Sequence, residues 1–185
     1  MRMARLLIPS FLLVVYGFIP AKAQTDLPPW PQEPDGFKGV QFGWTEKQAK
    51  SQMHWGRNAC FLFRGRLGCK AAIDGGGFTI ATRFNFDASG FILATGDFPS
   101  EDYEAVRDMF IGKYGKPYNI AESEVQNRMG ATFQQERLLW IGQRVQISMS
   151  RYGSTISEGF FMIGTIAAFA QDLDNEKATR EKALQ

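Results

Sequence analysis

The sequence has little of the chemistry that most enzymes use in their active sites. His54 is its one histidine, Cys60 and Cys69 are its two cysteines, and no serine stands in a Gly-x-Ser-x-Gly motif. Any serine or cysteine nucleophile that relies on a histidine base would have to use that single imidazole. We therefore predict that the protein is not an enzyme, and we assign no catalytic residue, no cofactor and no metal site.

The sequence also lacks a large excess of positive or negative charge. The chain has 21 Lys and Arg against 19 Asp and Glu, but Arg2, Arg5 and Lys22 precede the cleavage site described below. Removing them leaves 21 − 3 = 18 basic residues against 19 acidic ones, a net charge of about −1. This balance gives no support for a protein that binds nucleic acid or an anionic membrane surface.

The longest apolar run lies in the first 20 residues, and residues 1–23 have the three parts of a secretory signal peptide. Met1–Arg5 is basic, Leu6–Pro20 is mainly apolar, and a small-x-small pattern ends at Ala23. We predict cleavage between Ala23 and Gln24 and a mature protein that is periplasmic or secreted. The apolar stretch is short for a membrane span, so we expect no stable insertion after cleavage. An uncleaved anchor is the alternative.

Export changes the interpretation of the two cysteines. An oxidising compartment favours a disulfide between Cys60 and Cys69, and Gly65 between them predicts two short strands that bring the sulfurs together. Closing this loop stabilises the fold by roughly 2.5–3 kcal/mol in the chain-entropy model. The competing metal site would need both thiolates and His54, which is a poor set of ligands.

The same loop carries a candidate binding site. We predict a partner-binding tip formed by Phe61, Phe63, Arg64 and Arg66. Aromatic and arginine side chains are enriched among the residues that dominate interfaces, and a disulfide lowers the ordering cost of binding. The alternative is a solvated basic face, because every charged residue between Glu46 and Asp74 is basic. It would balance the five acidic residues from Asp97 to Asp108, which lie around the start of a predicted helix.

Composition divides the remaining chain into a lead-in, one domain and a tail. Residues 24–36 hold half of the prolines and predict an extended lead-in, and residues 174–185 predict a polar tail. Between them we expect one domain over 37–173. One predicted helix begins at the capping box formed by Thr45 and Gln48. A second predicted helix begins after Pro99 and Ser100. The predicted strands cover 78–86, 91–98, 131–141, 144–151 and 159–165.

The order of these elements predicts the fold class. Consecutive strands joined by tight turns require antiparallel pairing, and helices separated from the strands define the α+β class. We predict an α+β fold with an antiparallel sheet and helices packed on one face. A helix followed by strands occurs twice, which suggests two repeats over 37–98 and 99–165.

Three short motifs resemble those of a known group of exported domains. They are Phe42-Gly43-Trp44-Thr45 before a helix, Phe86-Asp87 with Gly90 at a hairpin, and Lys113-Tyr114-Gly115-Lys116-Pro117. Over 37–165 the chain resembles the β-lactamase-inhibitor-protein-like group and its relative, the small outer-membrane assembly lipoprotein. The resemblance implies a sheet backed by helices and a role in binding proteins. The residue directly after the predicted cleavage site is Gln24 and not the cysteine that carries the lipid in the lipoprotein relative.

These observations predict an exported, non-enzymatic protein-binding module, either an inhibitor or an envelope-assembly partner. The alternatives are a small secreted hydrolase and a ligand-carrying periplasmic domain. A deep pocket with convergent polar groups would favour the alternatives, whereas a flat or concave sheet would favour the binding module.

Overall fold

A computed structural model describes residues 27, 29–53, 55, 59–63, 65–127 and 129–183. The signal peptide predicted over 1–23, its cleavage site, His54 and Arg64 lie outside these residues. The helices are α1 (Glu46–Lys50), α2 (Tyr103–Tyr114) and α3 (Ile166–Ala183). The strands are β1 (Gly36–Phe37), β2 (Val40–Gln41), β3 (Cys60–Phe63), β4 (Arg66–Asp74), β5 (Thr79–Asp87), β6 (Gly90–Pro99), β7 (Asn119–Gln126), β8 (Thr132–Ile141), β9 (Val145–Ser150) and β10 (Glu158–Thr165).

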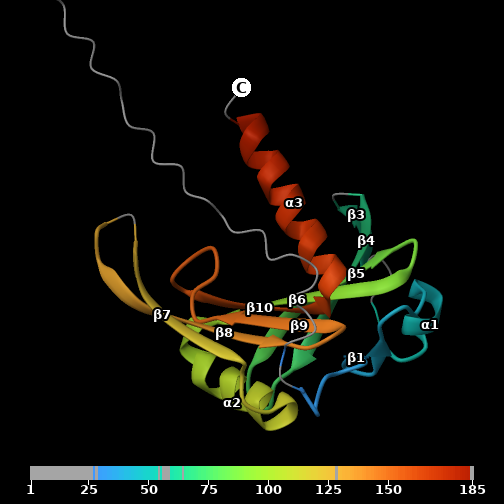
Figure 1. The fold of residues 1–185 in the computed structure, drawn as a ribbon, viewed down its shortest axis with the longest axis horizontal. Helices are drawn as coiled ribbons and strands as arrows, with labels where there is room; N and C mark the ends of the chain where they lie inside the picture. Colours follow the sequence, from blue (N-terminus) through green and yellow to red (C-terminus); the bar gives the residue numbers. More distant parts are fainter. Residues whose placement is uncertain are drawn as a thin grey trace, which may run out of the picture.

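An eight-stranded sheet is the centre of the molecule (Figure 1). Its strand order is β3-β4-β5-β6-β10-β9-β8-β7, and every neighbouring pair is antiparallel. β1 and β2 form a separate two-stranded sheet. The predicted α+β class and antiparallel sheet are confirmed, although strands dominate the fold and helices are few.

The hairpin between β5 and β6 shows why the sequence folds locally as predicted. The carboxylate of Asp87 accepts a hydrogen bond from the backbone N–H of Ser89 at 2.7 Å. Gly90 has φ +104°, and a Cβ there would lie 2.3 Å from the carbonyl oxygen of Gly43. Only glycine fits this turn, because any side chain would both strain the backbone and collide with the neighbouring loop.

One face of the sheet, the core face, packs against α1, α2 and the β1–β2 pair. Strand alternation directs Phe84, Ile147 and Phe161 to this face, and all three are fully buried. The side chains of α2 that pack here are Tyr103, Val106, Phe110 and Tyr114, the stripe that its spacing predicts. The ring of Phe110 lies 4.9 Å from that of Phe161, centroid to centroid.

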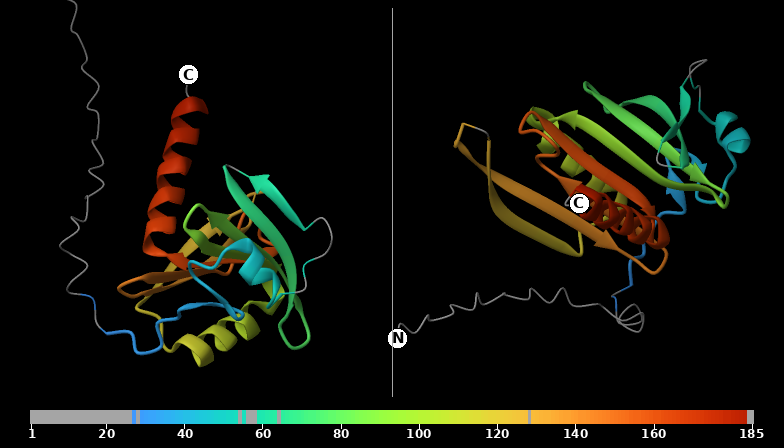
Figure 2. Two further views of the ribbon diagram at one scale, coloured as in Figure 1. Left: turned by 90° about the vertical axis from the view of Figure 1, so that its right-hand side faces the viewer. Right: turned by 90° about the horizontal axis from the view of Figure 1, so that it is seen from above.

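The third helix lies on the other side of the sheet (Figures 1 and 2). Ala168 and Phe169 pack against Ile92 and Leu93 of β6, Gln171 and Asp172 bond Arg66 of β4, and the end of α3 extends away from the strands. We predicted that the helices pack on one face of the sheet. The position of α3 differs from that prediction. The predicted polar tail is also helical as far as Ala183, since its alanine, lysine, glutamate and arginine residues favour a helix.

Sequence analysis did not predict the strand β7. Seven of its eight residues are exposed, so it lacks the alternation of apolar and polar residues that identifies a half-buried strand. Its place in the sheet comes from pairing with β8 alone. None of the helices in the described part of the chain is both long enough and apolar enough to cross a membrane.

Candidate functional site

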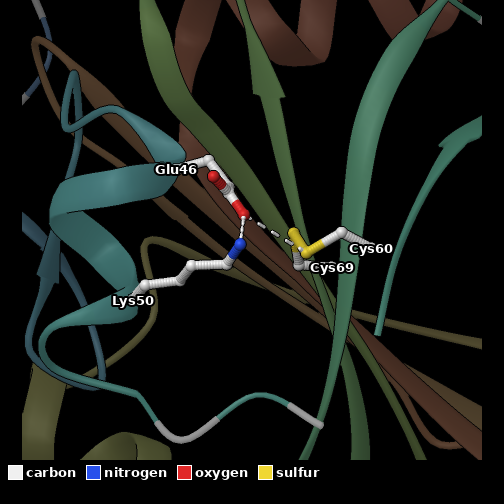
Figure 3. Close-up of a disulfide and its surroundings, with 4 residues drawn as sticks. All are labelled: Glu46, Lys50, Cys60 and Cys69. Atoms are coloured by element: carbon white, nitrogen blue, oxygen red, sulfur yellow. Dashed lines mark hydrogen bonds and ion pairs between the residues drawn. A yellow bond between two sulfur atoms is a disulfide. The ribbon is translucent and has the colours of Figure 1, made fainter. Parts of the chain in front are cut away.

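The two cysteines form the predicted disulfide (Figure 3). Cys60 and Cys69 stand directly opposite each other in β3 and β4, with their Cα atoms 4.0 Å apart. The carboxylate of Glu46, which pairs with Lys50, lies 3.7 Å from the sulfur of Cys60. Glu46 and the two cysteines have the proximity of a metal site, but sulfurs joined in a disulfide are not thiolates and do not bind metal.

Arg66 does not lie in an exposed tip. Its side chain is 10% exposed, and its guanidinium donates hydrogen bonds to Asp172 at 2.5 Å and to Gln171 at 2.6 Å. Strand alternation turns Arg66 toward the side of the sheet where α3 lies. The partner-binding prediction for Arg66 required an exposed guanidinium and is wrong on that point, because this side chain attaches α3 to β4.

Phe61 is the other predicted tip residue whose side chain the structure describes, and it does not form an exposed cluster with Arg66. Phe61 is partly buried, with the Lys70 ammonium 5.2 Å and the Arg83 guanidinium 5.8 Å from its ring centroid. Leu62 of β3 faces solvent, with an exposed fraction of 79%. Arg64 and the side chain of Phe63 lie outside the described residues.

A different surface gathers partly exposed apolar side chains. We call it the open face: the side of β8, β9 and β10 that points away from α2. Its large apolar side chains are Leu139, Ile141, Phe160 and Met162, all partly exposed. Ser148 is paired with Leu139 on one side and with Met162 on the other, so it lies at the centre of this group. In the part of the chain that the structure describes, α3 is the one helix on this side, and its cluster with Ile92 and Leu93 contacts Met162.

The open face ends in a cleft of about 580 Å³. The cleft lies between the β7–β8 hairpin and the loop over 152–156, and Met129, at 90% exposure, is on its rim. The buried side chain of Gln135 donates to the carbonyl of Tyr152 at 2.8 Å and accepts from its N–H at 3.0 Å. These two bonds fix the backbone of Tyr152, which lines the cleft together with Arg137, so the cleft combines an aromatic ring with a cation and apolar side chains.

At the opposite border of the open face, Asp97 of β6 pairs in register with Phe160. Partial burial raises the pKa of the Asp97 carboxyl, and the negative charge of Glu158 raises it further, while Arg83 opposes both effects. The open face therefore has an acidic border at β6 and a cationic one at Arg137.

Sequence analysis did not find the open face, although a signal for it was present. In the predicted strand over 159–165, Phe160 and Met162 alternate with Phe161 and Ile163, so both sides of the strand are apolar. The neighbouring predicted strand has serine and glutamine on one side. A strand that is apolar on both sides, next to one that is polar on one side, indicates apolar groups on a surface that water reaches.

No family model, curated protein or solved structure matches this chain. The resemblance to the β-lactamase-inhibitor-protein-like group, the absence of enzymatic activity, the export and the localisation all stay predictions.

Proposed function

We propose that this protein is an exported protein-binding module that holds its partner on the open face. The observation that supports this most directly is the group of four large apolar side chains around Ser148, which remain partly exposed in the middle of a rigid sheet. Apolar groups that are rimmed by polar ones and left uncovered are typical of protein interaction sites. A sheet surface also costs little to order on binding, because its backbone is already fixed.

The disulfide supports the exported location. Disulfides persist mainly in oxidising compartments, and this one joins the only two cysteines of the chain. We also propose that the two halves of the sheet are repeats. Support for this comes from the strand order, in which β3 to β6 and β7 to β10 each form a meander after a helix and meet at β6 and β10.

The cleft beside Tyr152 favours a second candidate function, that of a ligand-carrying domain. Its volume of about 580 Å³ lies within the range of small-molecule sites. Apolar walls and the guanidinium of Arg137 would suit an apolar molecule with one anionic group. This candidate requires the cleft to be filled by a small molecule rather than by a side chain of a protein partner.

The experiment compares two arginine substitutions on the same side of the sheet. Ser148→Arg places a charged side chain between Leu139 and Met162 without removing any core side chain. Thr79→Arg is the matched control, because Thr79 is exposed at the start of β5, away from the open face. Both tagged variants and the unchanged protein are used to capture partners from an envelope extract, and the captured protein is identified and titrated calorimetrically.

We expect Ser148→Arg to abolish capture of a protein that the unchanged chain and Thr79→Arg retain equally. Equal capture by all three proteins would overturn the assignment of the open face. Native mass spectrometry that instead finds a small molecule, lost on Arg137→Ala and not on Thr79→Arg, would favour the ligand-carrying candidate.

A further inference from the structure

The two edges of the sheet differ in how they are protected. An edge strand presents unpaired N–H and C=O groups, which natural proteins protect with short strands, proline, lysine or bulges. β3 at one edge has four residues and is tied to β4 by the disulfide. β7 at the other edge has eight residues, pairs with β8 without a register shift, and contains no proline and no lysine.

The register of β7 identifies which of its backbone groups are unpaired. Just beyond the strand, the backbone N–H of Asn127 donates to the carbonyl of Ala131 at 3.0 Å. The backbone groups of Asn127 therefore point toward the β8 side of the hairpin. Alternate residues of an antiparallel strand direct their backbone groups to opposite sides. The residues whose N–H and C=O point away from β8 are therefore Ile120, Glu122, Glu124 and Gln126.

The side chains of these same residues define what would lie beside them. Ile120 is 53% exposed. Among the described residues, neither Glu122 nor Glu124 has a cationic partner, and Glu124 accepts one hydrogen bond, from the amide of Gln134 at 3.1 Å. The edge therefore offers one apolar position followed by two unpaired carboxylates at a spacing of two residues.

We infer that β7 binds an extended, basic segment of a partner protein, which adds to the sheet as a ninth, antiparallel strand. In this arrangement the partner residues opposite Glu124, Glu122 and Ile120 follow one another at every second position. Opposite charges and apolar pairs that face each other across strands stabilise the pairing. The recognised segment thus has a basic residue, a second basic residue two positions later, and an aliphatic residue two positions after that.

A second copy of this chain fits the edge poorly. Antiparallel pairing of β7 with itself, centred on Glu122 or Ser123, places glutamate opposite glutamate, and like charges in that position destabilise a sheet. The same two carboxylates that select a basic partner therefore act against self-association. This inference does not rest on the open face, which involves other side chains and other strands.

The probe is an end-blocked peptide with the core lysine–threonine–lysine–threonine–valine. Its controls are the same peptide with glutamate in place of lysine and one with the two lysines adjacent. Titration of the isotope-labelled protein is followed by NMR and amide hydrogen exchange. We expect the amides of Ile120, Glu122, Glu124 and Gln126 to become protected, while the inward amides of Ala121 and Ser123 change little.

Three variants separate the backbone and charge contributions. Glu122→Pro removes an outward N–H and leaves the bonds to β8 intact, so it should abolish binding while the circular dichroism spectrum is retained. Glu122→Gln with Glu124→Gln should weaken binding about three- to ten-fold, since two cross-strand charge pairs are lost. Glu122→Lys with Glu124→Lys should reverse the preference toward the glutamate peptide. Ser148→Arg should leave peptide binding unchanged.

The inference is overturned if folded Glu122→Pro binds the lysine peptide as well as the unchanged protein, or if lysine and glutamate peptides bind equally. It is also overturned if sedimentation finds a dimer that Glu122→Pro dissociates, because the edge would then belong to a second copy.

Discussion

The two halves of the sheet bury their surfaces to different extents. In the half formed by β3 to β6, α1 and the β1–β2 pair lie on one face, α3 contacts the other, and the edge is a short strand closed by a disulfide. In the half formed by β7 to β10, α2 covers one face, and the edge strand is long and exposed. On the other face α3 reaches Met162 and leaves Leu139, Ile141 and Phe160 partly exposed. Both proposed binding surfaces therefore belong to the second half, although the basic loop that sequence analysis selected lies in the first.

The largest expected effect comes from the side chain where the two halves meet. Phe161 of β10 is fully buried, with ring centroids 4.9 Å from Phe110 and 5.5 Å from Phe37. Phe161→Ala should lower the free energy of unfolding by about 3–5 kcal/mol through lost burial and the cavity left behind. Urea denaturation should show one shifted transition with an unchanged slope. Two separate transitions would mean that the halves unfold independently and would contradict a shared core.

The next effect is specific to the closed half. Replacing Cys60 and Cys69 with serine should cost roughly 2.7 kcal/mol, because the unfolded chain regains the entropy of a ten-residue loop. Amide exchange should accelerate in β3 and β4 and stay unchanged in β7 and β8. A reduced sample of the unmodified protein should reproduce the result. Equal urea midpoints for the oxidised protein and the double serine variant would show that pairing with β4 holds β3 without the disulfide.

The elements that sequence analysis predicted are those with a local signal. The capping box is one, because Thr45 and Gln48 are three residues apart and each bonds the other's backbone N–H. The buried stripe of α2 and the β5–β6 hairpin are others, since helical spacing and a turn with Gly90 are visible in a short window. The disulfide belongs here too, because nine positions separate its cysteines.

The features that sequence analysis missed depend on distant contacts or on exposure. Asp172 lies 106 positions from Arg66, so nothing near Arg66 in the sequence indicates that its charge is paired. β7 has no buried side to produce a pattern, and its strand conformation follows from pairing with β8. The open face depends on the position of α3, which packs on β6 and reaches Met162 of β10 but leaves Leu139, Ile141 and Phe160 partly exposed. Tertiary packing decides that position.

A smaller effect is expected where α3 is attached to the closed half. Arg66→Ala removes two hydrogen bonds, one of them to the carboxylate of Asp172, whose side chain is 36% exposed in the folded protein. We expect a loss of about 1–3 kcal/mol and faster amide exchange along α3. Arg66→Lys should restore only part of the lost stability, since one ammonium replaces a planar guanidinium that bonds two side chains at once. If Arg66→Ala instead left the stability unchanged, the exposed basic tip would again be a valid hypothesis.

The smallest effect concerns pH and the border between the halves. Burial and Glu158 raise the pKa of Asp97 in the folded protein, so the folded state binds its proton more tightly than the unfolded state does. This contribution to stability is present below the ordinary aspartate pKa of about 3.9 and is lost as the pH rises through the folded value.

Asp97→Asn should therefore raise the melting temperature slightly at pH 7 and leave it unchanged near pH 3. Glu158→Gln should lower the pKa of Asp97 in an NMR titration, because it removes the neighbouring negative charge. A melting temperature lowered by Asp97→Asn at pH 7 would mean that the attraction to Arg83 outweighs burial. In that case the acidic border of the open face would stabilise the fold in its ionised form.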